Sequence, residues 1–429
     1  MKKINTSPIS GMQELLPENQ LIFDSLKSKI AETYKKHGYL HIETPTIDRD
    51  EILFAKAGGD TEKQVYRIFK TLETANESDQ SLRFDHTVPL ARYVVEHEND
   101  LTFPFKVTQL ARNFRGERSQ RGRFREFYQC DIDVVGRGTL PLSYDADVIL
   151  TLLKTFENFD LKTPVLARIS NRKILSGLIE AFNLEEKSKD IYSIIDHSEK
   201  VPPEKTRKGF EEIGLSPENI ELFLDFIGLS GSPKEIIEKL KNFHIQNEKF
   251  NLGLEELEKI TSLIELEHKN IVADMKIVRG LDYYTGTVFE FILPEYKEIG
   301  SVCGGGRYEN LASFFTDQLL PGVGGSIGLT RLFYVLNEKN LLESSKTAPI
   351  DYALIPLSEN ELDFTFALAE KLRKNNSVTT VLTDKKLGDK LAYASKIAKF
   401  GIVIGENEVK TKIMKVKNFL TSETLELNF

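Results

Sequence analysis

A dense group of arginines lies between positions 112 and 125 of this 429-residue chain. Within that window Glu117 is the one acidic residue, and the arginines are Arg112, Arg115, Arg118, Arg121, Arg123 and Arg125. A planar guanidinium group can bind a phosphate or a carboxylate through two parallel hydrogen bonds. So many positive charges repel one another unless an anion binds, and the group therefore predicts a site for an anionic ligand. The alternative is a basic hairpin that only faces solvent.

A second stretch that could bind a ligand is the loop at residues 279–286, with the sequence RGLDYYTG. It contains Arg279, Asp282, Tyr283 and Tyr284 between two glycines, and it leads into an apolar strand that carries one charge, Glu290. Loops held by a scaffold on one side and open on the other are common positions for binding residues. The loop is therefore interpreted as the wall of a ligand site, with a well-packed turn as the alternative.

The segments 105–115 and 123–135 predict a β-hairpin whose loop is bounded by Gly116 and Gly122. Alternate residues of a strand share a face. One face of the second strand is mostly polar, and it consists of Arg123, Arg125, Phe127, Gln129, Asp131 and Asp133. The other face is mostly apolar, with Phe124, Tyr128, Cys130, Ile132 and Val134 beside Glu126. A polar face of this kind either meets solvent or lines a polar cavity, and the arginines favour the cavity.

Two glycine-rich runs follow later in the chain, at residues 303–311 (CGGGRYENL) and 321–332 (PGVGGSIGLTRL). Glycine lets the backbone approach a ligand closely, and Arg331 follows the second run in an expected helix. Neither run has the spacing of a dinucleotide-binding or P-loop motif.

Composition limits the possible classes of protein. The chain is 40% hydrophobic and 28% charged, and its length suits two or three domains. It has no apolar run long enough for a membrane span and no apolar N-terminal signal segment. Cys130 and Cys303 are the only cysteines, and the histidines are scattered, so we expect neither a disulfide framework nor a metal site. A reducing cytoplasm is the expected location.

The formal net charge of −8 argues weakly against a general affinity for nucleic acid, although a local basic patch remains compatible with it.

Periodicity predicts helices at 17–38, 48–57 and 145–156, and strands between 65 and 84. A Lys/Glu-rich helical insertion is expected at about 175–267, with its charges on a solvated face. After a polar linker at 338–348, strands and helices alternate to the end, which predicts an α/β domain. Its last part is rich in lysine, at Lys410, Lys412, Lys415 and Lys417.

Four segments, in order along the chain, resemble the signatures of the histidyl-tRNA synthetases, a family of class II aminoacyl-tRNA synthetases. Residues 114–118 with 123–129 resemble the class II hairpin that binds ATP, and 328–332 resemble the third class II motif. Residues 279–286 and 304–308 resemble the two signatures specific to histidine. The resemblance extends over essentially the full length of the chain.

The resemblance implies a multidomain protein of α/β and α+β class. Its catalytic domain, at 1–340, would stand on a mainly antiparallel sheet and contain the helical insertion. Residues 349–429 would form an α/β domain that binds the anticodon. The implied activity is histidine–tRNA ligase: ATP activates histidine to histidyl-adenylate, and the histidyl group then moves to the 3′ end of tRNA(His). The implied cofactor requirement is ATP as a substrate with Mg²⁺, and relatives are homodimers.

The resemblance also assigns roles to individual residues. The implied catalytic residues are Arg279 and Arg115. The implied histidine-binding residues are Asp85, Thr87, Arg115, Gln129, Asp133, Arg279, Tyr283, Tyr284 and Tyr308. The implied ATP-binding residues are Arg115, Glu117, Arg123 and Arg331. No residue is assigned to a metal.

Two positions depart from the family pattern. His86 stands where relatives usually have a small or aliphatic residue, and Thr330 stands where an acidic residue is frequent. One rival hypothesis is a histidine-sensing regulatory paralogue that has lost catalysis and acts in histidine biosynthesis. Another is a non-catalytic RNA-binding module. The complete arginine hairpin argues against both, and the presence of a C-terminal α/β domain argues against the paralogue.

Overall fold

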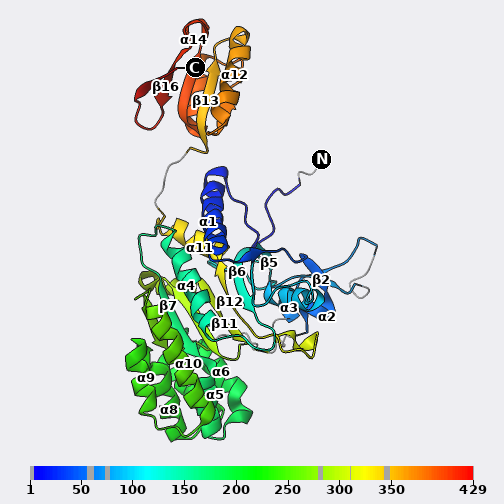
Figure 1. The fold of residues 1–429 in the computed structure, drawn as a ribbon, viewed down its shortest axis with the longest axis vertical. Helices are drawn as coiled ribbons and strands as arrows, with labels where there is room; N and C mark the ends of the chain where they lie inside the picture. The colour runs from blue at the N-terminus through cyan, green and yellow to red at the C-terminus, as the bar shows by residue number, and fades with distance from the viewer. Residues whose placement is uncertain are drawn as a thin grey trace. The chain divides into compact units, whose positions relative to one another are not determined.

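The computed structural model describes residues 4–55, 62–72, 78–278, 284–309, 311–342 and 348–428. The chain divides into two compact units (Figure 1). The first unit comprises Met1–Glu14 and Leu26–Leu342, and the second comprises Leu15–Ser25 and Glu343–Phe429. Within the described residues, none of the helices combines the length and the apolar character that crossing a membrane requires.

The first unit is built on a nine-stranded sheet with the strand order β1-β5-β6-β12-β11-β10-β7-β9-β8. The strands are β1 (Leu40–His41), β5 (Phe105–Phe114), β6 (Glu126–Val135), β7 (Leu166–Asn171), β8 (Ser230–Gly231), β9 (Ile271–Asp274), β10 (Thr287–Ile292), β11 (Cys303–Tyr308) and β12 (Gly322–Gly328). Neighbouring strands are antiparallel except in the pairs β1–β5 and β7–β9. The expected mainly antiparallel sheet is thus confirmed.

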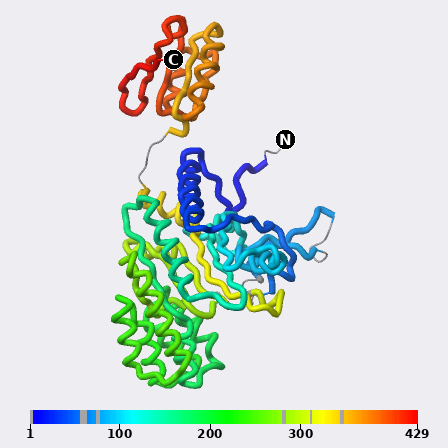
Figure 2. The backbone as a smooth tube through the Cα atoms, viewed as in Figure 1, coloured from blue at the N-terminus to red at the C-terminus, as the bar shows by residue number. Residues whose placement is uncertain are grey.

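The predicted hairpin supplies the second and third strands of this sheet, next to the edge strand β1. Strands β5 and β6 pair in continuous register from Phe105 opposite Val135 to Phe114 opposite Glu126. Cys130, Ile132 and Val134 are fully buried, as the apolar face of β6 requires. Strand β12 lies on the other side of β6, although almost 200 residues separate Gln129 from its partner Gly328 (Figure 2).

Helices cover the sheet. They are α3 (Thr87–Glu96), α4 (Ser143–Glu157) and α11 (Leu329–Glu338). Helix α1 (Pro17–Lys36) belongs to the first unit from Leu26 onward, and there the hydroxyl of Tyr34 donates to the carbonyl of Cys130 on β6 at 3.1 Å. Helix α4 packs its Phe156 ring 5.5 Å from the ring of Phe291 on β10. Helix α3 contributes Leu90 and Val94 to a separate apolar cluster with Phe105 and Val135. The amphipathic spacing of these helices therefore buries one face of each against the strands.

Short elements complete this part of the first unit. A three-stranded sheet has the order β2-β4-β3, with β2 (Ile47–Arg49), β3 (Arg67–Ile68) and β4 (Gln80–Leu82). Helix α2 spans Asp50–Leu53, and 3₁₀ turns lie at η1 (Glu62–Gln64), η3 (Pro294–Ile299) and η4 (Leu311–Phe314).

The Lys/Glu-rich segment follows β7 and precedes β9 in the chain, and it forms a group of helices (Figure 1). They are α5 (Arg172–Ala181), η2 (Glu185–Lys187), α6 (Ser188–His197), α7 (Pro203–Glu212), α8 (Pro217–Gly228), α9 (Pro233–Lys241) and α10 (Glu248–Glu265). Proline begins α7, α8 and α9, where its missing N–H is not needed. The side chains of Ser216 and Asn247 cap α8 and α10.

An ion-pair cluster joins these helices to the sheet. Arg168 on β7 pairs with Glu199, just after α6, and its Nε donates to Asp274 on β9 at 3.0 Å. Burial opposes the positive charge, but the bonds to Glu199 and Asp274 outweigh it and raise the pKa of Arg168 above its ordinary value. Arg168 therefore remains charged while it is only 6% exposed.

The second unit contains a five-stranded sheet with the order β14-β13-β15-β16-β17. Its strands are β13 (Ile350–Pro356), β14 (Val378–Thr380), β15 (Ala398–Ile404), β16 (Ile413–Asn418) and β17 (Thr424–Asn428). Its helices are η5 (Glu359–Glu361), α12 (Leu362–Arg373), α13 (Leu387–Ile397) and α14 (Glu406–Thr411). The lysine-rich end is a hairpin: Met414 and Val416 are buried on β16, whereas Lys415 and Lys417 alternate with them and are exposed.

Candidate functional site

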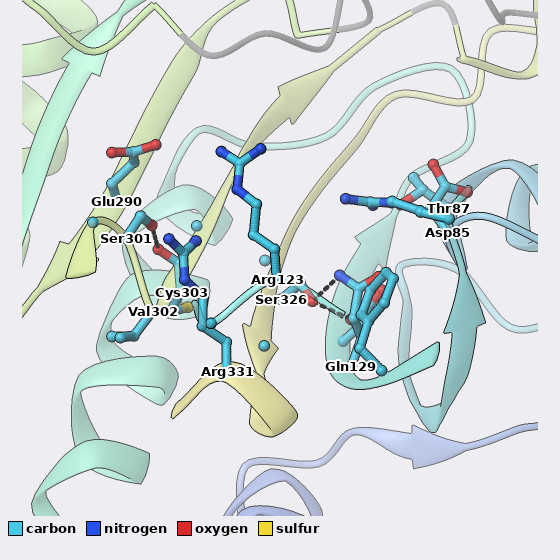
Figure 3. Close-up of a pocket in the computed structure, with 18 of the residues that line it drawn as sticks. Asp85, Thr87, Arg123, Gln129, Glu290, Ser301, Val302, Cys303, Ser326 and Arg331 are labelled. Atoms are coloured by element: carbon cyan, nitrogen blue, oxygen red, sulfur yellow. Dashed lines mark hydrogen bonds between the residues drawn. The ribbon is translucent and has the colours of Figure 1, made fainter. Parts of the chain in front are cut away.

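One pocket of about 580 Å³ in the first unit brings together most of the residues that the sequence singled out. It is lined by side chains from β5–β6 and its loop, β11, β12 and the start of α3, among them Asp85, Thr87, Arg115, Glu117, Arg123, Gln129, Asp133, Tyr284, Tyr308 and Arg331 (Figure 3). Arg279 and Tyr283 lie outside the described residues. The polar face predicted for β6 therefore lines a cavity.

Asp85 lies at the entrance to α3, where its Oδ1 accepts a hydrogen bond of 3.2 Å from the backbone N–H of Val88. Its side chain is buried within the pocket wall. Burial raises the pKa of Asp85, while the Val88 N–H and the charge of Arg115 oppose the rise. The carboxylate of Asp85 is thus held in a fixed position, and a positively charged ligand beside it would stabilise its ionised form.

Asp133 on β6 and Tyr308 on β11 form a buried pair across the strand β12 that lies between them. The hydroxyl of Tyr308 donates to Oδ1 of Asp133 at 3.0 Å. Burial, followed by the charge of Asp131, raises the pKa of Asp133 well above its ordinary value. Burial and the nearby Asp133 also raise the pKa of Tyr308. The pair presents acceptor and donor groups in a buried position, which is suited to a ligand that carries both kinds of group.

Two glycines of β12 make room for this pair. Gly324 lies directly opposite Asp133 in the sheet, and Gly322 lies opposite Tyr308. A Cβ at Gly324 would approach Oδ1 of Asp133 to 1.9 Å, and one at Gly322 would approach the Tyr308 ring to 2.3 Å. The glycines of this run therefore let the backbone of β12 lie close to Asp133 and Tyr308, as the composition of the run suggested.

Gln129 is held from two sides. Its Nε2 donates to Oγ of Ser326 on β12 at 2.7 Å, and its Oε1 accepts from Nδ2 of Asn113 on β5 at 2.7 Å. The Ser326 hydroxyl in turn donates to Oδ1 of Asp131. The sheet register creates this chain, because Ser326 lies directly opposite Asp131.

Cationic side chains line other parts of the pocket. The Nε of Arg115 donates to the carbonyl of Phe84 at 3.1 Å, and its guanidinium lies 5.0 Å from the centre of the Phe127 ring. Arg123 pairs with Glu117 at 3.1 Å within the loop that precedes β6. Figure 3 shows Arg331 beside Ser301 and Cys303, opposite Asp85 and Thr87, with Arg123 between the two sides.

The pocket therefore has two chemical ends. Asp85 and Gln129 offer carboxylate and amide acceptors at one end, while Arg123 and Arg331 supply positive charge toward the other. Asp133 also lines the pocket and lies close enough to Asp85 for the two charges to interact. Such a pocket can bind an amine or ring N–H at one end and phosphates at the other. Among the described residues, no group of three or more His, Cys, Asp or Glu side chains could hold a metal ion.

Sequence reasoning missed several residues of the pocket. Ser326 lies in a glycine-rich run and Asn113 on the partner strand, and only the strand register shows that they reach Gln129. Asp196, Glu199 and Lys200 from the helical insertion also line the pocket, although Glu199 and Lys200 are exposed as the solvated face predicts. Glu290 was noticed as a lone charge but received no role, and it too lines the pocket.

Comparisons with known proteins agree with the sequence signatures. The family model for histidyl-tRNA synthetases matches residues 11–332, and the model for an anticodon-binding domain matches residues 351–429. A protein of Clostridium tetani described as histidine–tRNA ligase is 44% identical over 98% of this chain and 96% of its own length.

Solved structures agree as well. The crystal structure of a histidyl-tRNA synthetase from a Nostoc species has a TM-score of 0.90 and 36% identity, over 99% of this chain and 97% of that one. A Bacillus halodurans protein, described as an ATP phosphoribosyltransferase regulatory subunit/histidyl-tRNA synthetase, has a TM-score of 0.76 and 22% identity, over 91% of this chain and 97% of that one. At that identity the likeness concerns the fold alone. The full-length match to the clostridial protein and the match of the family model to the pocket-bearing unit lead to one conclusion: this chain belongs to the histidyl-tRNA synthetase family.

Proposed function

We propose that this chain is a histidine–tRNA ligase that activates histidine with ATP and transfers it to tRNA(His). The observation that carries the proposal is a single pocket that joins buried carboxylates to arginines, in a chain with full-length similarity to such ligases. The histidine carboxylate attacks the α-phosphorus of ATP, a new O–P bond forms, and pyrophosphate leaves. The ribose at the 3′ end of the tRNA then takes the histidyl group, and AMP leaves.

We assign the carboxylate end of the pocket to histidine. Asp85, Thr87 and Gln129 bind the α-amino group, and Asp133 with Tyr284 and Tyr308 binds the imidazole. Tyr283 is assigned beside them from the sequence. The donor and acceptor of a neutral imidazole match the carboxylate and hydroxyl groups there. An amino acid without those groups would leave buried polar atoms unpaired, and the pocket would reject it.

The arginines supply the catalysis. The attacking carboxylate and the α-phosphate are both anionic, so positive charge fixed between them lowers the barrier and stabilises charge that grows in the transition state. Arg115 bonds the α-phosphate, and Arg279 completes that group in the loop that the sequence identified. Glu117 contacts the adenine side, while Arg123 and Arg331 contact the phosphates. A carboxylate is already ionised, so this step needs no general base.

Magnesium enters as part of the MgATP substrate. The ion usually binds through one or two carboxylates together with the phosphates. Glu290 lines the pocket on the same side as Arg331 in Figure 3, and its carboxylate is a ligand of the kind that Mg²⁺ binds. We therefore assign Glu290 as the side chain that would meet the ion.

Residues 1–340 are proposed as the catalytic domain, with the insertion at about 175–267, and residues 349–429 as the anticodon-binding domain. The family-model matches at 11–332 and 351–429 support this division. We further propose a homodimer, as the resemblance to the family implies, and sedimentation equilibrium measures the mass. We infer that the enzyme works in the cytoplasm, where histidine, ATP and tRNA meet.

The direct test is exchange of labelled pyrophosphate into ATP, with each amino acid in turn and no tRNA present. The proposal predicts exchange with histidine and background with the others. A folded protein that binds histidine without exchanging pyrophosphate would instead be a histidine sensor and would contradict the proposal. Adding tRNA(His) transcript should then yield histidyl-tRNA.

Replacing Arg115 by alanine should reduce the rate of histidine-dependent exchange by about 100-fold or more, since a fixed charge at the reacting phosphate is lost. Arg112→Ala is the matched control, three residues earlier on the same hairpin. Arg112 pairs with Glu126 at 3.0 Å, with 64% of its side chain exposed, and it is not among the described residues that line the pocket. Equal losses in the two variants would remove Arg115 from the assigned role.

Replacing Asp133 by asparagine should stabilise the protein at neutral pH while weakening histidine binding. The folded state raises the pKa of Asp133. The favourable contribution of Asp133 to the free energy of unfolding is therefore present below the unfolded pKa and is lost as pH rises through the folded pKa. Asparagine does not titrate, so the melting temperature of the variant should exceed that of the parent by a margin that grows from about pH 4 upward. Melting curves without histidine at several pH values measure the effect. A parent that is more stable at pH 7 would refute the prediction.

A control of opposite sign lies in the second unit. Hydrogen bonds from Ser377 and the charge of Lys399 lower the pKa of Asp351 to about 2. That stability is present above the unfolded pKa and is lost as pH falls toward 2. Asp351→Asn should therefore lower the stability of its unit at neutral pH, and the difference should shrink in acid.

Exposed lysines of the C-terminal hairpin should contact tRNA phosphates. The double variant Lys415→Ala/Lys417→Ala should bind tRNA(His) about 3- to 10-fold more weakly, with a shallower dependence of affinity on salt. Pyrophosphate exchange without tRNA should stay unchanged. The Lys415→Arg/Lys417→Arg variant keeps both charges and should retain affinity. If the alanine variant binds as tightly as the parent, these lysines lie outside the tRNA interface.

A further inference from the structure

His86 is a buried side chain to which neither the family signatures nor the reaction assigns a role. It lies between Asp85 and Thr87, and its exposed fraction is 0%. It therefore belongs to the packed wall behind the pocket. Its carbonyl accepts from the backbone N–H of Leu90 at 2.9 Å and from Nε2 of Gln109 at 3.2 Å, so the start of α3 is fixed around it.

The imidazole of His86 contacts a carboxylate of the pocket. Its Nδ1 lies 3.1 Å from Oδ2 of Asp131, and both side chains are almost completely buried, at 0% and 6% exposure. The contact is an ion-pair distance and not a hydrogen bond, because neither ring nitrogen of His86 has a hydrogen-bond partner among the described residues. The other oxygen of Asp131 accepts from the hydroxyl of Ser326.

Asp131, which His86 contacts, determines the direction of a chain of hydrogen bonds. A carboxylate accepts only, so Ser326 gives its single proton to Asp131 and must accept from its other neighbour. That neighbour is the Nε2 group of Gln129, at 2.7 Å. The amide oxygen of Gln129 is then turned away from Ser326, toward Asn113, and it keeps a second lone pair that a ligand can use.

We propose that His86 is a positioning residue for the amino-acid end of the pocket: through Asp131 and Ser326 it fixes the Gln129 amide so that its oxygen receives the α-amino group of the substrate. The proposal rests on the proposed function, because it takes histidine as the ligand. His86 also lies between Asp85 and Thr87 in the chain, next to the other two residues assigned to the amino group.

The test compares His86→Leu, which removes the polar contact at similar volume, with His86→Asn, whose amide NH₂ can replace Nδ1. Leucine removes the polar contact at Oδ2 of Asp131 that holds this carboxylate in place, and KM for histidine in pyrophosphate exchange should rise about tenfold. KM for ATP and kcat should stay within about twofold. Asparagine should return KM for histidine to within about threefold of the parent. A loss of kcat and of affinity for both substrates, without rescue by asparagine, would overturn the proposal.

An analogue without the α-amino group separates positioning from general damage to the pocket. Imidazolepropionate has the ring and the carboxylate of histidine but no amine, so its inhibition constant should change less than about threefold in His86→Leu. If histidine and the analogue lose affinity equally, His86 only maintains the pocket and the proposal fails.

Ser326→Ala provides a second route should His86→Leu fail to fold, because it breaks the same chain nearer to Gln129. It should reproduce the selective loss of histidine affinity, and the double variant should lose little more than either single one, since both interrupt one chain. Additive losses would contradict the chain. If the parent protein shows no histidine-dependent exchange at all, the proposed function fails instead. If the parent exchanges pyrophosphate normally but the variants lose affinity for histidine and for the other ligands alike, only the role of His86 is refuted.

Discussion

The burial of three carboxylates in one pocket is the constraint around which the first unit is organised. Asp85, Asp131 and Asp133 are each about 5% exposed or less. Burial raises the pKa of Asp85 and of Asp133, and the charge of Asp131 raises both further. Each carboxylate has a local donor: the Val88 N–H for Asp85, Ser326 for Asp131, and Tyr308 for Asp133. Such a site is costly when empty and is suited to a ligand that brings an ammonium group and an imidazole.

The antiparallel sheet makes this arrangement possible. Strand β12 lies between β6 and β11, and its register puts Gly324 opposite Asp133 and Ser326 opposite Asp131. A side chain larger than hydrogen at position 324 would collide with the carboxylate of Asp133. The hydroxyl of Ser326, in contrast, can donate a hydrogen bond to the carboxylate of Asp131. Arg168, Asp274 and Glu199 then tie the inserted helices to the same sheet, which brings charged residues of the insertion to the pocket.

Much of the site could be predicted because its signals are local in the sequence. The alternation along β6 predicts which side chains face the cavity, and the density of arginines predicts an anionic ligand. Ser326 and Asn113 could not be predicted, because their roles arise from strand register between distant segments. The C-terminal hairpin was read only as a lysine-rich segment, since its alternation of Met414 and Val416 with lysines is short. The described residues do not include Arg279, so its assignment still rests on the sequence.

The central claim is that buried polar groups of this pocket recognise the ring of histidine. The most direct measurement is a calorimetric titration of the intact protein with histidine and with β-(2-thienyl)alanine, which has a similar shape but no ring nitrogen. A pocket whose carboxylate and hydroxyl groups need partners should bind the thienyl analogue at least about 100-fold more weakly. Affinities within about threefold of each other would mean that the pocket reads shape alone, and they would contradict the account.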